Sequence, residues 1–193
     1  MADAFDILHS RIAQLLGRRD RVLAAIDGMA ASGKTTLCER LRSAIPGCRV
    51  VHMDDFTLPF EQRGDGYFDR LLSNADIQRF TAEVLEPLDR GEDAVYRPYR
   101  CHPDPGFLAP VTIPAGARCV IVEGAYCLHP QLFDRYDLRV LMTVPPDTQR
   151  ARILARNGAD GLRSFEARWI PMENRHIASR RLAERCDILL SGD

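Results

Sequence analysis

Apolar residues fall into five short runs along this chain, and several of the segments between them have the spacing of amphipathic helices. The runs are 22–26, 48–53, 119–122, 138–144 and 186–190. Runs of this length are typical of strands buried on both faces, and strands that alternate with helices form parallel sheets. A chain of 193 residues has the size of one domain. The pattern therefore predicts a single α/β domain over residues 1–193, with a doubly wound, five-stranded parallel sheet.

Four stretches place their apolar residues on one helical face. The first, 5–16, stops at Gly17 and is expected to pack outside the sheet. The second follows residue 35, and the third begins at Ser73 or Asn74 and ends at Gly91. The fourth opens at residues 145–147 and ends near residue 158. Together with the apolar runs, these stretches give the alternation that a doubly wound sheet requires.

The first apolar run leads directly into Gly-Met-Ala-Ala-Ser-Gly-Lys-Thr at positions 28–35. This sequence fits the P-loop, in which glycines let successive backbone N–H groups point at phosphate oxygens beside a helix N-terminus. A strand before the motif and helical spacing after it are the context that the motif needs. The sequence therefore predicts a nucleotide site made by Gly28, Ala30, Ala31, Ser32, Gly33, Lys34, Thr35 and Thr36.

Two side chains of this motif carry candidate chemistry. Lys34 is the only lysine in the chain, and its compact ammonium suits the β- and γ-phosphates of a donor better than an arginine fork does. Lys34 is therefore predicted to be catalytic. The Thr35 hydroxyl can ligate Mg²⁺. ATP and Mg²⁺ are the predicted cofactors, and the preference for ATP over GTP is left open.

Acidic residues close two of the apolar runs. Asp54 and Asp55 follow the run 48–53, and Glu123 follows the run 119–122. Because ligands of open α/β sheets bind at the carboxyl ends of the strands, Asp54 can receive a proton from a substrate hydroxyl there, or hold Mg²⁺ through water. Asp55 is expected to face away, in a turn or a helix start. Glu123 has the Walker B pattern and is predicted to serve Mg²⁺ with Thr35.

Three further segments are candidates for the surroundings of a substrate. Residues 58–73 predict an exposed loop near the site. Residues 94–117 are rich in proline, which edge strands tolerate, and predict a two-stranded ribbon with Tyr99 and His102 near its tip. This ribbon either lines a substrate pocket or is a plain excursion. Residues 157–175 predict a lid, interrupted at Pro171. On and before this lid, arginines that can reach a transferring phosphoryl group are Arg152, Arg156 and Arg163; the alternative is a solvated basic face.

The overall composition argues against several partners. The formal net charge is −1, whereas a nucleic-acid surface needs a basic stripe. The six cysteines are scattered without a Cys-x-x-Cys pair, as is typical of reduced thiols in the cytoplasm. No apolar run approaches a membrane span, and the N-terminus lacks the apolar region of a signal peptide. We therefore expect a cytoplasmic protein without nucleic-acid or membrane partners. A homo-oligomer is left open.

Taken together, these segments resemble the uridine kinase and phosphoribulokinase group of P-loop kinases. The resemblance rests on the P-loop, on Met-Asp-Asp-Phe at 53–56, on Val-Glu-Gly at 122–124 and on the arginine-bearing helix with its lid. The closer similarity is to short bacterial uridine kinase-like proteins, through EVLEPL, YRPY, VEGAYCLHP, RILARNG and RWIPMEN. It covers nearly the whole chain from the first strand to the lid. It implies a P-loop NTPase fold with a small β-ribbon and an arginine-bearing lid.

The resemblance also implies roles for single residues. Asp54 would be the base that receives the proton of the acceptor hydroxyl, and Glu123 would serve the metal. Asp76 matches a position that holds sugar hydroxyls, and Tyr99 matches an aromatic residue that contacts the base of a nucleoside. His102 is placed loosely against a ribbon histidine of the family. Arginines that would stabilise phosphoryl charge are Arg152, Arg156 and those of the lid, Arg163 among them.

The implied activity is an ATP- and Mg²⁺-dependent kinase that phosphorylates a hydroxyl of a small molecule, most simply a nucleoside. Departures from the family leave the acceptor open. Uridine kinases carry Asp-Phe after the ribbon tyrosine, where this chain has Arg100 and Cys101, and the lid here is built around Trp169. Pantothenate or a sugar are alternative acceptors. A nucleotide-binding regulatory protein without acceptor chemistry is the alternative class, and the acid after the second strand favours an enzyme over it.

Overall fold

The computed structural model describes residues 3–64, 75–101 and 103–192. Its main helices are α1 Ala4–Leu16, α2 Lys34–Ala44, α3 Ile77–Phe80, α4 Glu86–Asp89, α5 Pro146–Ser164, α6 Ile170–Ser179 and α7 Leu182–Arg185. Its strands are β1 Val22–Gly28, β2 Cys48–His52, β3 Ala94–Tyr96, β4 Tyr99–Arg100, β5 Gly106–Phe107, β6 Val111–Ile113, β7 Cys119–Glu123, β8 Leu138–Thr143 and β9 Ile188–Ser191. One π-helical turn, Thr81–Leu85, joins α3 to α4, and another, Phe165–Trp169, joins α5 to α6.

Five of the strands form one sheet in the order β2-β7-β1-β8-β9, and every neighbouring pair in it is parallel. The central strand β1 lies between β7 and β8, so the P-loop that follows it sits in the middle of the sheet's carboxyl edge. The predicted five-stranded α/β fold is confirmed. No helix within the described ranges is long and apolar enough to cross a membrane.

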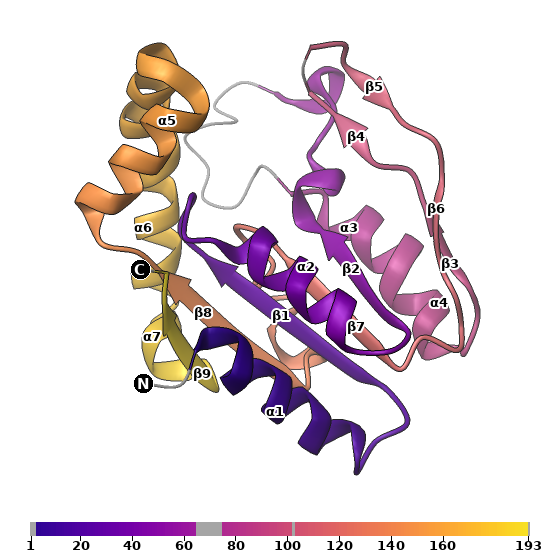
Figure 1. Ribbon diagram of the computed structural model, residues 1–193. Coiled ribbons are helices and arrows are strands. Elements are labelled where there is room, and N and C mark those ends of the chain that lie inside the picture. Colours follow the sequence, from indigo (N-terminus) through magenta and orange to yellow (C-terminus); the bar gives the residue numbers. More distant parts are fainter. Residues whose placement is uncertain (1–2, 65–74, 102, 193) are drawn as a thin grey trace.

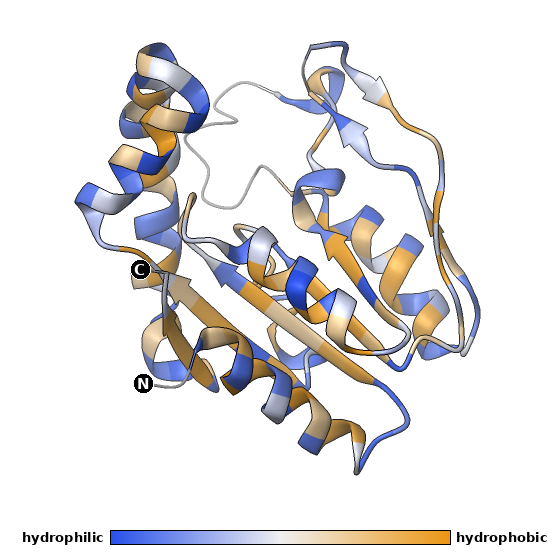
Figure 2. Ribbon diagram, viewed as in Figure 1, coloured by the Kyte–Doolittle hydropathy of each residue, from blue (hydrophilic) through white to orange (hydrophobic). Residues whose placement is uncertain are grey.

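Helices cover both faces of the sheet (Figure 1). Leu8 and Ile12 of α1 and Leu41 of α2 pack with Ala24 and Ile26 of β1 in one core cluster. Ala25, which points to the other face because side chains alternate along a strand, belongs to the second cluster with the helices from α3 to α4 and with α7. Figure 2 shows the strands of the main sheet as mostly apolar and the outward helix faces as polar.

The predicted ribbon of residues 94–117 forms as two separate antiparallel ladders. β3 pairs with β6, with Ala94 opposite Ile113, and β4 pairs with β5, with Tyr99 opposite Phe107. Neither ladder joins the main sheet in the described residues. In Figure 1 the β4–β5 hairpin and the helices α5 and α6 lie on opposite sides of the sheet's carboxyl edge.

Several predicted boundaries differ from the structure. β2 ends at His52, and Asp54 and Asp55 lie in a 3₁₀ turn, Met53–Phe56, instead of closing the strand. The predicted caps Ser73 and Asn74 lie outside the described residues, and the described start of α3 is capped by the Asp76 side chain.

The segment 157–175, predicted to be a lid, is more helical than expected. Gly158 breaks α5 with φ 70° and ψ −178°, but the helix resumes beyond it. Pro171 does not interrupt the helical run. Pro171 directly follows the π-helical turn Phe165–Trp169, and a π-helical turn is a place where a helix departs from its regular hydrogen-bond ladder.

Candidate active site

The P-loop connects β1 to α2 through a tight approach to β8. Gly28 has φ 145°, and a Cβ at this position would lie 1.9 Å from the carbonyl oxygen of Met142. Only glycine fits this approach. Ala31 adopts the left-handed conformation, with φ 58°. The loop thus turns sharply and directs its backbone towards the space above the N-terminus of α2, as a phosphate site requires.

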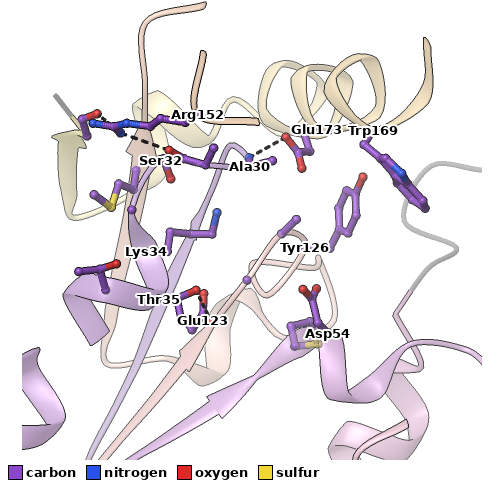
Figure 3. Close-up of a pocket in the computed structure, with 18 of the residues that line it drawn as sticks. Ala30, Ser32, Lys34, Thr35, Asp54, Glu123, Tyr126, Arg152, Trp169 and Glu173 are labelled. Carbon is purple, nitrogen blue, oxygen red and sulfur yellow. Dashed lines mark hydrogen bonds between the residues drawn. The ribbon is translucent and has the colours of Figure 1, made fainter. Parts of the chain in front are cut away.

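Lys34 and Thr35 start α2 and face the same space (Figure 3). The Lys34 Nζ donates hydrogen bonds to the carbonyl oxygens of Gly28 (2.9 Å) and Met29 (2.7 Å). The Thr35 hydroxyl donates to Glu123 Oε1 at 3.1 Å. The same Glu123 oxygen lies 2.6 Å from His52 Nδ1, and this hydrogen bond raises the pKa of His52. Thr35 and Glu123, predicted from separate motifs to serve one metal, are therefore neighbours.

The two acids after β2 point to different places, as their positions predict. Asp54 lies in the cleft beside the P-loop. Desolvation by the surrounding protein raises the pKa of Asp54, and the negative charge of Glu123 raises it too. The side chain is nevertheless open to the cleft. Asp55 instead accepts a hydrogen bond from the hydroxyl of Tyr96 at 3.3 Å. Of the two carboxylates, only Asp54 can meet a ligand at the P-loop.

Helices α5 and α6 contact the P-loop backbone directly. The Ala30 N–H donates to Glu173 Oε2 (2.9 Å), and the Ala30 carbonyl accepts from Gln149 Nε2 (3.0 Å). Arg152 donates to the carbonyl oxygens of Ala31 (3.2 Å) and Gly192 (2.7 Å). The predicted lid and the helix before it are thus hydrogen-bonded to the backbone of the P-loop. Burial raises the pKa of Glu173 to about 7, since a charged carboxylate loses solvation there.

These elements enclose a cleft of about 930 Å³ at the carboxyl edge of the sheet. The predicted site residues that line it are Ala30, Ala31, Ser32, Gly33, Lys34, Thr35, Thr36, Asp54, Glu123, Arg152 and Arg156. Aromatic residues from two segments, Phe60 on one side and Phe165 and Trp169 on the lid, line it as well. Its volume is within the range of small-molecule and cofactor sites.

The remaining predicted residues lie elsewhere. Gly28 packs against the backbone of Met142 and does not line the cleft. The Asp76 side chain accepts a hydrogen bond from the Arg79 N–H at 3.0 Å, and Asp76 does not line the cleft among the described residues. Tyr99 is buried, and its hydroxyl accepts from the Phe60 N–H at 3.4 Å. Arg163 is exposed and pairs with Asp160. His102 lies outside the described residues.

Sequence reasoning missed a group of buried polar residues behind the P-loop. Asp27, the residue before Gly28, accepts hydrogen bonds from the N–H groups of Gly28 (2.6 Å) and Leu128 (2.8 Å) and lies 3.0 Å from His176 Nε2. Tyr126 and Glu173 complete the group. Asp27 closes an apolar strand directly before the motif, and this position was the one available signal.

The site fits Mg²⁺ that is held with the help of the donor. Within the described ranges, no three histidine, cysteine or acidic side chains converge as metal ligands. Mg²⁺ in phosphoryl-transfer sites keeps several waters and binds one or two protein oxygens plus substrate phosphates. The Thr35 hydroxyl and the Glu123 carboxylate, in contact at 3.1 Å, supply the protein's share of such a site.

Comparison with known proteins found no matching family model. A putative uridine kinase of Schizosaccharomyces pombe is 29% identical over 198 residues, which cover 90% of this chain and 82% of that protein. Nicotinamide riboside kinase 2 of Mus musculus is 29% identical over 141 residues, 68% of this chain and 66% of the relative. The tRNA-specific adenosine deaminase subunit tad2 of S. pombe is 32% identical over 143 residues, but the chain spans only 33% of its length.

Among solved structures, a possible uridine kinase from Bacillus stearothermophilus superposes with a TM-score of 0.70 at 19% identity, covering 96% of this chain and 100% of that one. The parallel sheet and the P-loop after its central strand have the arrangement of a P-loop kinase fold. The more particular resemblance, to uridine kinase-like P-loop kinases, is confirmed by these matches.

Proposed function

We propose that this protein is an ATP- and Mg²⁺-dependent kinase that phosphorylates a hydroxyl of a small molecule, with a nucleoside as the favoured acceptor. The observation that carries the proposal is the meeting of Lys34, Thr35 and Asp54 in one cleft. Groups that bind donor phosphates and a carboxylate that can take an acceptor proton lie together there. The relatives named above, a putative uridine kinase and a nicotinamide riboside kinase, support the nucleoside.

The donor half of the reaction uses the P-loop. The backbone N–H groups of the loop and the N-terminus of α2 bind the triphosphate, and Lys34 leaves its carbonyl partners to contact the β- and γ-phosphates. Thr35 and Glu123 hold Mg²⁺, which neutralises charge on the phosphates. Arg156, which lines the cleft from α5, stabilises the phosphoryl group in transfer.

The acceptor half uses Asp54. Its carboxylate hydrogen-bonds to the reacting hydroxyl and receives the proton as the oxygen attacks the γ-phosphorus in line with the leaving ADP. The raised pKa of Asp54 suits this role, because a base works best when its pKa approaches the working pH. Phosphoryl transfer depends mainly on positioning and charge stabilisation, so the enclosed cleft supplies much of the catalysis.

A panel of acceptors tests the proposal. The protein is incubated with Mg·ATP or Mg·GTP and with single nucleosides, sugars or pantothenate, and ADP or GDP release is coupled to NADH oxidation. We expect ATP turnover that rises on addition of a nucleoside, with a phosphorylated nucleoside detected by mass spectrometry and no rise in the Asp54→Asn variant. Turnover with a sugar or with pantothenate instead would show that the acceptor is not a nucleoside. Acceptor-independent hydrolysis, or binding of ATP without turnover, would favour a regulatory P-loop protein.

A further inference from the structure

Tyr126 has two features that its place in the fold does not explain. Its φ is 73°, a left-handed conformation that is a genuine outlier for a bulky side chain. Its hydroxyl is buried and has no hydrogen-bond partner among the described residues, and the side chain is only 4% exposed. Both features cost stability, and strained residues and unpartnered buried polar groups cluster at functional sites.

A buried aspartate–histidine pair holds Tyr126 in this conformation. Asp27 Oδ1 accepts a hydrogen bond from the Tyr126 N–H at 3.3 Å, and Asp27 Oδ2 lies 3.0 Å from His176 Nε2. The rings of His176 and Tyr126 pack in a T-shaped arrangement, with 5.2 Å between the centroids. These contacts use the backbone and the ring of Tyr126. None of them uses the hydroxyl, so they fix its position without satisfying it.

Tyr126 stands on the acceptor side of the cleft. It follows β7, the strand that ends in Glu123, and it lines the cleft together with Asp54 and Glu173. In Figure 3 the ring lies on the Asp54 and Trp169 side, away from Lys34, Thr35 and Arg152. Burial and the charges of Glu173, Asp27 and Asp54 raise the pKa of the phenol above its usual value. The hydroxyl therefore stays protonated and acts as a donor.

We propose that the Tyr126 hydroxyl binds the acceptor, by donating a hydrogen bond to a second acceptor oxygen close to the hydroxyl that is phosphorylated. This inference rests on the proposed function. The acceptor is then a polyol, with one hydroxyl on Asp54 and a neighbouring oxygen on Tyr126, and the two contacts together orient the reacting oxygen. Because the tyrosine hydroxyl is covered, the side chains around it must move apart for the acceptor to reach it. Asp76, whose side chain caps α3, is not needed for this contact.

Two tyrosine-to-phenylalanine variants separate binding from structure. Tyr126→Phe removes the unpartnered hydroxyl. Tyr136→Phe, the matched control, removes a buried hydroxyl that donates to the Cys127 carbonyl at 3.0 Å. We expect Tyr136→Phe to lower the Tm and leave the acceptor KM unchanged. Tyr126→Phe should not lower the Tm, but should raise the acceptor KM about 3- to 10-fold, the usual effect of one hydrogen bond, with the KM for ATP unchanged.

Acceptor analogues complete the test. For an acceptor found in the panel, the analogue that lacks the second hydroxyl should have the same KM with the wild-type protein and with Tyr126→Phe, because the contact is already absent. A Tyr126→Phe variant with a wild-type acceptor KM, a change confined to the KM for ATP, or a loss of Tm like that of Tyr136→Phe without a change of acceptor KM would each overturn the inference. An active wild-type protein with an unchanged variant rejects only the role of Tyr126. A wild-type protein that phosphorylates no acceptor rejects the proposed function, and this inference with it.

Discussion

The proposed donor and acceptor halves of the cleft are built in different ways. The donor half consists of consecutive residues, 28–36, whose backbone carries most of the binding groups, with Lys34 and Thr35 as the chemically active side chains. The acceptor half is assembled from side chains of separate segments, with Asp54 after β2, Tyr126 after β7 and Trp169 between α5 and α6. One half is a local structure, and the other exists only in the folded chain.

This difference follows from the two ligands: the phosphate chain of the donor is constant, and the acceptor varies from one kinase to another. A phosphate chain is the same in every donor, and a loop of backbone N–H groups recognises it with little help from side chains. An acceptor is recognised by its own shape and polar groups, which only side chains can match. We therefore expect substitutions in the donor half to abolish turnover with any acceptor. Substitutions in the acceptor half should change which acceptor is used, except at the base itself.

The largest effect is expected at Lys34. Lys34→Met removes the ammonium that bridges the donor phosphates, and should lower kcat about a thousandfold or more with every acceptor. Lys34→Arg is the control for charge alone: because the guanidinium fork does not fit the position, we expect it to restore little activity. Circular dichroism checks that both variants fold. A folded Lys34→Met variant with normal rates would contradict the P-loop assignment.

Asp54 tests whether the acceptor half contains one essential group. Asp54→Asn should lower the single-turnover rate by about 10²- to 10⁴-fold, as is typical when a positioned base is removed, and leave ATP affinity nearly unchanged. Asp55→Asn, the matched neighbour, should cost far less, because Asp55 accepts from Tyr96 at 3.3 Å and does not line the cleft. Equal losses, or a larger loss at Asp55, would show that the base has been assigned to the wrong carboxylate.

The sequence predicted the donor half in detail and the acceptor half only in part. The P-loop could be predicted because its function is carried by the backbone of one short segment, and the sheet because its apolar runs are continuous. Asp54 lines the cleft, at the carboxyl edge where it was predicted, although β2 ends one residue earlier than expected. The 3₁₀ turn Met53–Phe56 directly follows β2, so the Asp54 side chain still lies at the carboxyl edge of the sheet.

Tyr126, Glu173 and His176 could not be predicted, since contacts made between distant segments leave no local pattern. Asp27 meets His176 across 149 positions, and Ala30 meets Glu173 across 143. The π-helical turn Phe165–Trp169, directly before Pro171, likewise has no local sequence pattern that predicts it. The functional roles of all the predicted site residues stay predictions, and of these residues Asp76, Tyr99 and Arg163 do not line the cleft.

Glu123 links the two halves through the metal. Glu123→Gln keeps a side-chain oxygen for Thr35 but lowers the charge beside Mg²⁺. We expect a 10- to 100-fold loss in kcat or in apparent Mg²⁺ affinity, the usual effect of removing a group that orients a metal or its waters. Activity is titrated with Mg²⁺ at fixed ATP. His52→Gln, which removes the partner at 2.6 Å from Glu123, is the control and should change Mg²⁺ dependence less. Normal Mg²⁺ dependence of Glu123→Gln would reject its role in the metal site.

The smallest expected effect concerns Glu173, which joins the acceptor-side lid to the donor-side loop. Its carboxylate accepts from the Ala30 N–H at 2.9 Å and is 6% exposed. Burial, helped by the charges of Asp27 and Asp54 and opposed by the Ala30 N–H and Lys34, raises its pKa from the ordinary 4.5 to about 7. Between these two values the folded protein holds a proton that the unfolded chain has released. The contribution to stability is therefore complete below about pH 4.5 and is lost as the pH rises through about 7.

Glu173→Gln keeps an oxygen for the Ala30 N–H but cannot ionise. Relative to this variant, the wild-type protein should lose up to about 3 kcal/mol of unfolding free energy between pH 5 and pH 8, measured by urea denaturation at each pH. Glu166→Gln is the control, because Glu166 lies on the same lid but pairs with Arg150 at 2.5 Å, and it should keep the wild-type pH dependence. If Glu173→Gln has the wild-type slope, the carboxylate is not held against the P-loop in solution, and the two halves of the cleft are not coupled through it. If the slope disappears, Glu173 is buried against the P-loop in solution as it is in the structure. A donor phosphate that binds the Ala30 N–H then has to displace the Glu173 side chain from it.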